Sequence, residues 1–166
     1  MTPTDLDRRL ARVQLLLLDV DGVLTDGGVT YDDQGGESKT FHIRDGLALR
    51  AWQRAGLRAG IITGRSSRVV ERRAAELGIK ILRQGIDDKF AAATEVIAEC
   101  GLSWDDTAFL GDDLPDLPVV ARCGVGAAVV TALPGGRGAV RELIERLLGA
   151  RGGWDAVVAG YTAQRA

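Results

Sequence analysis

The sequence predicts an α/β fold, in which a mostly parallel, Rossmann-like sheet has helices on both faces and a β-hairpin is inserted after the first strand. The main observation is that short apolar runs alternate with amphipathic stretches whose apolar residues recur at i, i+3 and i+4. Glycines at 56, 78 and 101 stand where three of these helices are expected to end. A polar turn between two strand-like segments predicts the hairpin.

The expected elements follow in order along the chain. Strands are predicted at the apolar runs 13–20, 58–63, 80–83, 107–111 and 124–130. Helices are predicted at the amphipathic stretches 47–55, 68–77, 89–100, 114–121 and 139–148. The hairpin insert spans residues 28–43, with one strand around Val29 and Tyr31, a turn at 32–36 and the second strand at 39–43.

Length and composition indicate one soluble domain. The chain has 166 residues, of which 46% are hydrophobic and 27% charged, and its formal net charge is −2. A chain of this size buries enough apolar surface to fold without disulfides or a structural metal. We therefore expect residues 1–150 to form a single domain. Residues 151–166 begin near a pair of glycines and lack clear periodicity, which predicts a tail whose order depends on what it contacts.

Composition also argues against several classes of protein. His42 is the single histidine, and Cys100 and Cys123 lack metal-site spacing, so we expect no zinc site and two buried, reduced thiols. The apolar run Leu15–Leu18 is too short to cross a membrane or to form a signal peptide, which predicts a cytoplasmic protein. The 21 basic residues are spread along the chain and balanced by 23 acids, so no nucleic-acid partner is expected.

Polar and charged side chains follow the ends of the predicted strands. In an open parallel sheet, ligands bind at the carboxyl ends of the strands. Carboxylates, a hydroxyl group and cations are therefore predicted to meet at one edge of the sheet. In chain order, these residues are Asp19, Asp21, Thr63, Gly64, Arg65, Lys89, Asp112 and Asp113.

The acids of this set indicate a metal site. Asp19 and Asp21 end an apolar strand with two negative charges, which is unfavourable unless a cation neutralises them. Asp112, at another strand end, supplies a further oxygen. With few carboxylates and space for water and phosphate oxygens, the expected ion is Mg²⁺. Any one of these acids alone fits a turn or a helix cap equally well, but that interpretation fits all of them together poorly.

Thr63 and Lys89 have the properties that a phosphoryl group requires. Thr63 lies between a strand end and a helix start, where free N–H groups and the helix dipole favour anions. Lys89 alone would more often be a solvated residue at a helix N-terminus, and its place among the strand ends is what favours a function. A carboxylate nucleophile surrounded by Mg²⁺, an ammonium group and N–H donors makes a phosphoryl-transfer site.

A known motif lies in residues 19–25, DVDGVLT, which resemble the first motif of haloacid dehalogenase-type phosphatases. Thr63, Lys89 and the segment 111–116 match the second, third and fourth motifs in the right order. Within that superfamily, residues 13–150 are similar to the small, capless family of 3-deoxy-D-manno-octulosonate 8-phosphate phosphatases. This closer similarity rests on segments 39–46, 61–66, 84–85 and 135–142.

The resemblance implies a role for each matching residue. Asp19 would be the nucleophile that forms an aspartyl-phosphate, and Asp21 the general acid that protonates the leaving alcohol and later activates water. Asp19, the backbone carbonyl of Asp21, and Asp112 would hold Mg²⁺. Thr63 and Lys89 would bind the phosphoryl oxygens. The implied substrate is 3-deoxy-D-manno-octulosonate 8-phosphate, a phosphorylated sugar acid of lipopolysaccharide precursor synthesis.

Further residues would contact the sugar acid in this resemblance. Arginine suits such a substrate because its guanidinium binds carboxylate and phosphate groups in a bidentate manner. For Arg73, which lies within a charge-rich helix, an exposed position without a role is a stronger alternative than for the others. The implied substrate residues are Asp21, His42, Ile43, Arg44, Asp45, Gly46, Arg50, Arg65, Arg73 and Lys89.

The resemblance also implies a homotetramer. A chain without a cap domain closes its site by other means, and hairpins of neighbouring subunits would form a central barrel that supplies part of the cap. The tail 151–166 would be a mobile lid over a neighbour's site. One departure is local: the family usually has a short helix and a strand before the element at 135–138, whereas here Val129 is followed directly by Val130.

Three alternatives stay open at this point. The same chemistry would serve another nonulosonate or sugar phosphate, because specificity rests on few residues. A non-catalytic binding domain would keep the fold without the chemistry, although the presence of both Asp19 and Asp21 speaks against it. A two-component receiver domain also gathers acids, a threonine and a lysine, but its phosphorylated aspartate would end the third strand.

Overall fold

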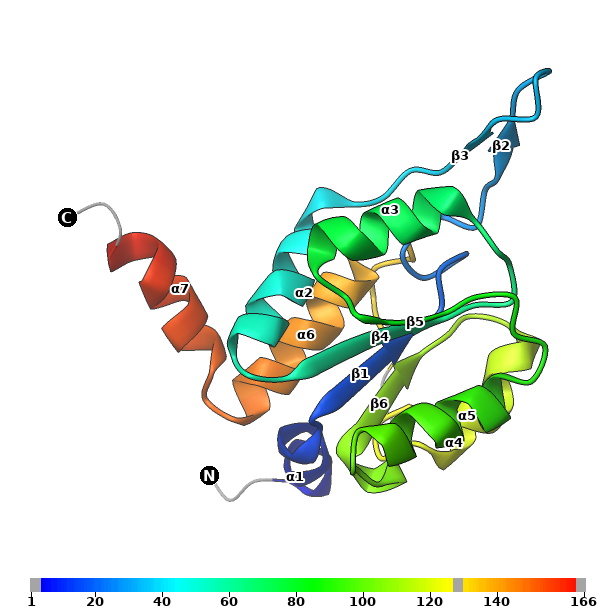
Figure 1. The fold of residues 1–166 in the computed structure, drawn as a ribbon. Helices are drawn as coiled ribbons and strands as arrows, with labels where there is room; N and C mark the ends of the chain where they lie inside the picture. Colours follow the sequence, from blue (N-terminus) through cyan, green and yellow to red (C-terminus); the bar gives the residue numbers. More distant parts are fainter. Residues whose placement is uncertain (1–3, 127–129, 164–166) are drawn as a thin grey trace.

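The computed structural model describes residues 4–126 and 130–163, and it has the α/β architecture that the sequence predicts (Figure 1). The main sheet has the order β5-β4-β1-β6, and all of its pairings are parallel. Its strands are β1 (Leu15–Leu18), β4 (Arg58–Ile62), β5 (Ile81–Arg83) and β6 (Thr107–Leu110). The hairpin strands β2 (Thr30–Tyr31) and β3 (Glu37–Ser38) form a separate antiparallel sheet that projects from the body of the molecule.

Helices cover both faces of the main sheet. Leu16 and Leu18 pack into a core with α1, α2, α3 and α6, whereas Leu15 and Leu17 pack with α4 and α5. Because successive side chains of a strand point to opposite faces, an unbroken apolar run is what a central strand between two helical layers requires. The helices are α1 (Asp5–Arg12), α2 (Ile43–Arg54), α3 (Arg68–Leu77), α4 (Lys89–Glu99), α5 (Leu117–Arg122), α6 (Ala139–Ala150) and α7 (Trp154–Ala163).

Helix α2 begins about one turn earlier than the periodicity predicts. It starts at Ile43, after His42 in an extended N-cap conformation, and not at residue 47. Asp45 in the first turn is favourable at the positive end of the helix dipole. Gly46 interrupts the apolar pattern, and a Cβ at this position would overlap the guanidinium of Arg73 on α3. The close packing of α2 against α3 therefore explains why residue 46 is a glycine. That glycine breaks the apolar pattern from which the start of α2 would otherwise be predicted.

The second strand of the hairpin also lies earlier than predicted. Thr30 pairs with Ser38, so the paired segment is β3 and not residues 39–43. The turn accounts for this, because Asp32 accepts a hydrogen bond from the backbone N–H of Gly36 at 2.6 Å and closes the loop early. The chain after β3 is consequently free to return to the carboxyl edge of the main sheet.

The helix predicted at 114–121 is divided in two. A 3₁₀ helix, η2 (Leu114–Asp116), precedes α5. Pro115 and Pro118 each stand in the first turn of one of these helices, where a missing N–H costs little, and they prevent one continuous helix.

The strand predicted at 124–130 is reduced in the described residues to a bridge between Val125 and Ala108. A second 3₁₀ helix, η1 (Trp104–Asp106), leads into β6, which Val125 borders. Residues 127–129, and with them one side of the Val129–Val130 junction, lie outside the described residues.

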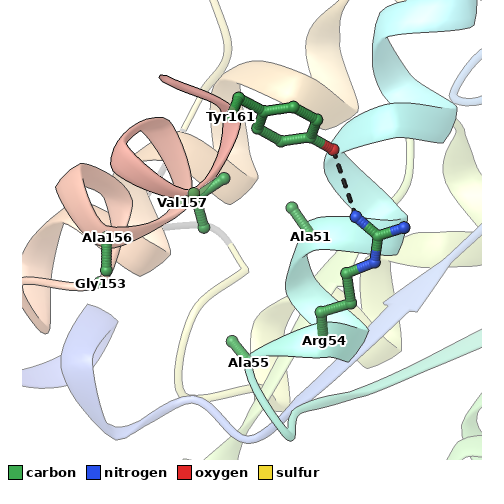
Figure 2. A pocket seen from close by; sticks show the side chains of 8 residues that line it. Ala51, Arg54, Ala55, Gly153, Ala156, Val157 and Tyr161 are labelled. Carbon is green, nitrogen blue, oxygen red and sulfur yellow. Dashed lines mark hydrogen bonds between the residues drawn. The ribbon is translucent and has the colours of Figure 1, made fainter. Parts of the chain in front are cut away.

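Helices at both ends of the chain are absent from the sequence prediction. At the start, Thr4 and Asp7 form a capping box for α1. At the other end, α7 lies within the predicted tail and packs on α6, with the Arg141 guanidinium 4.6 Å from the Trp154 ring centroid. Figure 2 shows the groove of about 360 Å³ between α2 and α7, where Arg54 donates a hydrogen bond to the Tyr161 hydroxyl at 3.4 Å.

Three features named from composition can be located in the structure. Among the described residues, no helix is both long enough and apolar enough to span a bilayer. Both cysteines are free thiols; Cys123 is buried as predicted, whereas Cys100 is half-buried. The three glycines predicted to end helices, Gly56, Gly78 and Gly101, have left-handed φ values of 80°, 71° and 66°.

Candidate active site

The predicted strand ends meet around a cavity of about 440 Å³. Because β1 is central and pairs in parallel with both β4 and β6, the loops that follow these strands come together at one edge of the sheet. Lys89 joins them as the first residue of α4. Six predicted site residues line the cavity: Asp19, Asp21, Thr63, Arg65, Lys89 and Asp112.

Asp19 and Lys89 form a buried ion pair at this cavity. Asp19 is 7% exposed, and its Oδ2 lies 2.8 Å from Nζ of Lys89. Its Oδ1 accepts a hydrogen bond from the backbone N–H of Val20 at 2.7 Å. Burial acts to lower the pKa of Lys89, but Asp116 and Asp19 together outweigh it, so the pKa of Lys89 is raised. The lysine is therefore a permanent cation that orients the carboxylate.

Asp116 belongs to the same group, although it has no role of its own in the sequence prediction. It is 1% exposed, and its Oδ1 accepts a hydrogen bond from Lys89 Nζ at 2.6 Å. Its Oδ2 accepts hydrogen bonds from the backbone N–H groups of Asp112 and Asp113 at 3.1 and 3.2 Å. Asp116 thus holds both the lysine and the loop that carries Asp112. Its signal in the sequence is its place at the end of segment 111–116.

Carboxylate oxygens of Asp19, Asp112 and Asp116 lie within 4.8 Å of one another, a spacing suited to a metal ion. Burial, followed by the negative charges of Asp19, Asp116 and Asp113, raises the pKa of Asp112. A divalent cation at this position would offset that repulsion, and the all-oxygen donor set suits Mg²⁺. Asp19 and Asp112 line the cavity and Asp116 does not, so the first two are the side chains that face such an ion.

The loop after β1 is supported from behind by a glycine-rich segment that leads into α6. The backbone N–H of Gly136 donates a hydrogen bond to the carbonyl of Val23 at 3.1 Å. At Gly135, a Cβ would overlap the carbonyl of Gly22, so the two backbones approach as closely as their atoms allow. The segment similar to the family at 135–142 is therefore a direct support of the first motif.

Thr63 lies at the end of β4, where its backbone is fixed on both sides. The residue is 2% exposed. Its N–H donates a hydrogen bond to the carbonyl of Arg83 at 3.0 Å, and its carbonyl accepts one from the N–H of Ile86 at 3.2 Å. The hydroxyl group is thereby held at the cavity by backbone contacts with β5 and the loop that follows it.

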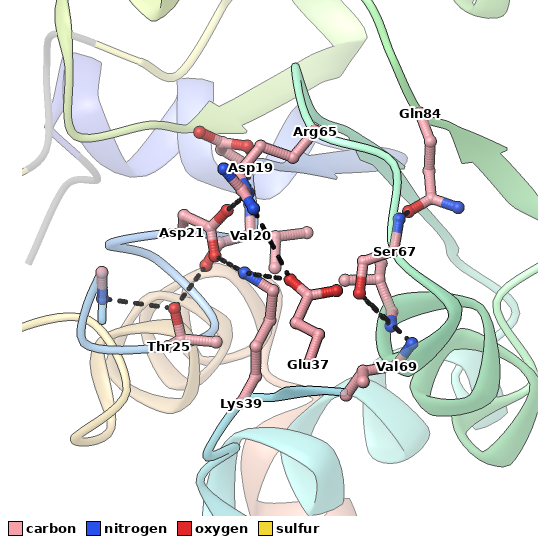
Figure 3. A network of polar contacts seen from close by, with 12 residues as sticks. Asp19, Val20, Asp21, Thr25, Glu37, Lys39, Arg65, Ser67, Val69 and Gln84 are labelled. Carbon is pink, nitrogen blue, oxygen red and sulfur yellow. Dashed lines mark hydrogen bonds and ion pairs between the residues drawn. The ribbon is translucent and has the colours of Figure 1, made fainter. Parts of the chain in front are cut away.

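Asp21 is contacted by two cations from different parts of the chain (Figure 3). Its Oδ1 accepts a hydrogen bond from Nζ of Lys39, and its Oδ2 lies 3.6 Å from Nε of Arg65. Lys39 follows β3, so the base of the hairpin returns to the site. Lys39 has no role in the sequence prediction, although two of the three lysines in this arginine-rich chain, Lys39 and Lys89, contact site carboxylates.

The other predicted substrate residues lie outside the lining of this cavity, on α2, just before it, or on α3. Ile43 is 83% exposed, whereas Asp45 is 1% exposed and its Oδ1 accepts a hydrogen bond from the backbone N–H of Arg141 at 2.8 Å. Arg73, on α3, donates a hydrogen bond to the carbonyl of His42 at 3.4 Å. This second group comprises His42, Ile43, Arg44, Asp45, Gly46, Arg50 and Arg73.

The class of protein follows from fold and site together. Acidic residues end the central strand β1, a threonine ends β4, a lysine begins α4, and an acidic loop follows β6. This arrangement defines a haloacid dehalogenase-type hydrolase. In a receiver domain the phosphorylated aspartate ends the third strand, whereas Asp19 here follows the first.

Comparisons with known proteins identify the family. No family model matches the chain. The chain is 36% identical over 160 residues to the 3-deoxy-D-manno-octulosonate 8-phosphate phosphatase of Haemophilus influenzae, with 89% of each chain covered. It is 38% identical over 164 residues to that of Escherichia coli K12, covering 91% of this chain and 87% of the relative. The chain belongs to the 3-deoxy-D-manno-octulosonate 8-phosphate phosphatase family.

Solved structures agree with this assignment. The phosphatase of this name from Moraxella catarrhalis matches with a TM-score of 0.92 at 39% identity, covering 95% of this chain and 98% of that one. Its crystal structure contains a magnesium ion, a phosphate ion and KDO. The Yersinia pestis phosphatase matches with a TM-score of 0.87 at 37% identity, covering 93% and 90%. The predicted fold class and family resemblance are thus confirmed.

Proposed function

We propose that this chain hydrolyses 3-deoxy-D-manno-octulosonate 8-phosphate to the free sugar acid and inorganic phosphate. The observation that carries the proposal is the Asp19 carboxylate, which lines the cavity while the Lys89 ammonium lies 2.8 Å from its Oδ2. A carboxylate held in this way is a positioned nucleophile beside a cation that stabilises phosphoryl oxygens. The names of the relatives, and the ligands of the Moraxella catarrhalis structure, support the substrate.

In the first step, a carboxylate oxygen of Asp19 attacks the phosphorus atom and the bond from phosphorus to the sugar oxygen breaks. The electron pair stays on the sugar oxygen, and Asp21 donates a proton to it. The products of this step are the sugar acid and an aspartyl-phosphate on Asp19. The ammonium of Lys89 and the hydroxyl of Thr63 bind the phosphoryl oxygens as charge builds up on them.

In the second step, the Asp21 carboxylate accepts a proton from a water molecule, whose oxygen attacks the phosphorus atom. The bond from phosphorus to Asp19 breaks, which releases phosphate and restores the carboxylate. Asp19, Asp112 and the backbone carbonyl of Asp21 would hold Mg²⁺, which supplies positive charge against the phosphoryl group when bound. Asp116 fixes Lys89 and the Asp112 loop throughout.

The experiment that tests the activity measures phosphate release from 3-deoxy-D-manno-octulosonate 8-phosphate with Mg²⁺ and after chelation. We expect release to require Mg²⁺ and to be abolished in Asp19→Asn, while the variant keeps the circular dichroism and thermal unfolding of the native chain. Full activity of Asp19→Asn, or a rate indifferent to chelation, would contradict the proposal.

A second candidate is the same chemistry on another nonulosonate or sugar phosphate. Arg65 is half-exposed, with 48% of its side chain accessible. Its guanidinium could bind the carboxylate or phosphate of many anionic sugars, which favours this candidate. Comparing kcat/KM across phosphorylated sugar acids and neutral sugar phosphates separates the two candidates. The octulosonate phosphate is expected to have the highest kcat/KM, and a higher value for a neutral sugar phosphate would favour the alternative.

We also infer a cytoplasmic homotetramer, in which residues 1–150 form the catalytic domain and the hairpins of four subunits pack together. The exposed Ile43 and Arg44 at the N-terminus of α2 would then contact the substrate bound to a neighbouring subunit. Arg50 on α2 and Arg73 on α3 would belong to the same substrate-binding group. Residues 151–166 would approach a neighbour's site as a lid.

Two measurements test this assembly. Sedimentation equilibrium is expected to give four times the mass of 17.6 kDa, and a monomer would contradict the tetramer. Removal of residues 151–166 is expected to raise the KM for the octulosonate phosphate. The shortened chain is still expected to form a tetramer, with four times the mass of its own single chain. An unchanged KM would exclude the lid.

A further inference from the structure

Four charged side chains form a closed ring beside the cavity, which we call the hairpin ring: Asp21, Glu37, Lys39 and Arg65 (Figure 3). They come from the loop after β1, from β3, from the segment that follows β3 and from the loop after β4. Each acid contacts both cations, so the ring carries no net formal charge. The hairpin is thereby joined to two of the loops that form the site.

The two cations of the hairpin ring differ in exposure. The side chain of Lys39 is 0% exposed, whereas that of Arg65 is 48% exposed. The Lys39 ammonium donates a hydrogen bond to Oδ1 of Asp21 and lies 3.5 Å from Oε1 of Glu37. That Glu37 oxygen is buried without a hydrogen-bond partner among the described residues, and the nearest charges to it are Lys39 at 3.5 Å and Arg65 at 3.8 Å.

A side chain with no accessible surface cannot contact a ligand in the cavity. Lys39 does not line the cavity, whereas Asp21 and Arg65 do. Any influence of Lys39 on the reaction therefore passes through the carboxylates that it contacts. Of the two acids, Asp21 lines the cavity and Glu37 does not.

The contact with Lys39 is also the stronger restraint on Asp21. The Arg65 guanidinium lies 3.6 Å from Oδ2 and is half-exposed, so water screens its attraction. The Lys39 ammonium is shielded from water and hydrogen-bonds to Oδ1, so its attraction is screened less. The orientation of the carboxylate is therefore set mainly from the hairpin side.

We infer that Lys39 is a positioning residue for Asp21, holding the carboxyl group in the orientation from which it reaches the leaving-group oxygen. This inference rests on the proposed function, in which Asp21 protonates the leaving alcohol. Attack by Asp19 does not involve the hairpin ring. Loss of Lys39 therefore lowers the rate of hydrolysis most for those substrates whose leaving group must be protonated.

The test compares two phosphomonoesters in the presence of Mg²⁺. The leaving group of 3-deoxy-D-manno-octulosonate 8-phosphate is an alkoxide, which must be protonated, whereas p-nitrophenolate leaves without a proton. Positioned acids contribute about 10²–10⁴-fold to such reactions. For Lys39→Met we expect kcat/KM to fall on the order of 10²-fold for the sugar phosphate, and by no more than about threefold for p-nitrophenyl phosphate.

A matched control is available in this chain. Lys80→Met makes the same substitution at an exposed residue that precedes β5, at the amino end of the sheet, and is expected to leave both rates unchanged. A second variant guards against misfolding: Lys39→Met combined with Glu37→Gln removes one charge of each sign, and the ring keeps equal numbers of both. Thermal unfolding reports whether each variant folds. The double variant is expected to show the same selective loss on the sugar phosphate.

A double-mutant cycle with Asp21→Asn completes the test. If Lys39 acts through Asp21, adding Lys39→Met to Asp21→Asn lowers the rate on the sugar phosphate no further. An equal loss on both esters, a restored sugar-phosphate rate in Lys39→Met/Glu37→Gln, or additive effects in the cycle would each overturn the inference. If Asp21→Asn itself shows no selectivity between the esters, the proposed role of Asp21 fails instead, which distinguishes the two.

Discussion

The ammonium of Lys89 lies 2.6 Å from Oδ1 of Asp116, and the two side chains are 5% and 1% exposed. Two charges removed from water in this way are stable only when each compensates the other. The pair fixes the lysine that contacts Asp19, and the second Asp116 oxygen fixes the backbone of Asp112. One buried carboxylate thus holds the cation and the acidic loop of the site in register.

Replacing Asp116 with asparagine is expected to lower both stability and activity. An amide cannot accept hydrogen bonds at both of its ends, so either Lys89 or the Asp112 loop loses its partner. We expect the free energy of unfolding to fall by about 3 kcal/mol. We also expect kcat to fall on the order of 10²-fold. Urea unfolding and phosphate release measure the two effects. Asp33→Asn, at an exposed turn position, is the control, and equal stability of the two variants would contradict the prediction.

Gly22 is expected to tolerate no side chain. Its φ is +86°, and a Cβ there would overlap the carboxylate of Asp112. Gly56 has φ +80°, and a Cβ there would have nothing within 4 Å of it. A Gly56→Ala variant therefore measures the backbone strain alone, which is about 1–2 kcal/mol. We expect Gly56→Ala to lose stability but keep its activity. Gly22→Ala is expected to lose phosphate release and the rise in Tm on adding Mg²⁺, and retention of both would refute the proposed role of Asp112.

Asp45 is expected to make stability fall as the pH rises. Burial, only partly opposed by the backbone N–H of Arg141, raises the pKa of Asp45 above its ordinary value of 3.8. Between 3.8 and the raised pKa, the folded chain binds a proton more tightly than the unfolded chain. This contribution to stability is therefore greatest at low pH and is lost as Asp45 ionises.

Two variants at this position separate charge from helix capping. Asp45→Asn keeps an oxygen for the N–H of Arg141 and is expected to remove this part of the pH dependence without loss of stability at pH 7. Asp45→Ala removes the acceptor at the start of α6 and is expected to cost about 1 kcal/mol. Urea unfolding at several pH values measures both. A less stable Asp45→Asn than Asp45→Ala at neutral pH would contradict the assignment.

Cys123 is expected to be unreactive in the folded protein. The thiol is 6% exposed, and burial raises its pKa to about 12. At pH 8 only about one molecule in 10⁴ then carries the thiolate that reacts with disulfide reagents. In a Cys100→Ser variant, labelling with Ellman's reagent is expected only at the rate of unfolding. Labelling within seconds under native conditions would show that the thiol is accessible.

The sequence predicts best the parts of the site that local pattern determines. Asp19 follows an apolar run and Thr63 follows another, so the parallel sheet alone brings them together. Lys39 escapes prediction because its contact with Asp21 depends on where the hairpin turn closes, which Asp32 determines through a short-range hydrogen bond. The partners of a buried charge are a property of tertiary structure, and no local period reveals them.

The same distinction explains the fold. The burial of β1 on both faces is evident in its unbroken run of leucines. The start of α2 is instead obscured by Gly46, a glycine that the close approach of Arg73 from α3 requires. Helix α7 has no clear apolar stripe, and its position depends on Trp154 packing beneath Arg141. Elements that are stabilised mainly by contacts with residues far away in the sequence are the ones that a single sequence does not predict.

The support of the first motif by Gly135 and Gly136 has a consequence for synthesis of the protein. The loop that carries Asp19 and Asp21 leaves the ribosome early, but the backbone against which it rests is among the last parts of the domain to be made. A nascent chain that ends before Gly135 contains all four catalytic motifs and still lacks the backbone that supports the first of them. We therefore expect a chain truncated before Gly135 to release no phosphate, because the loop that carries Asp19 and Asp21 lacks this support.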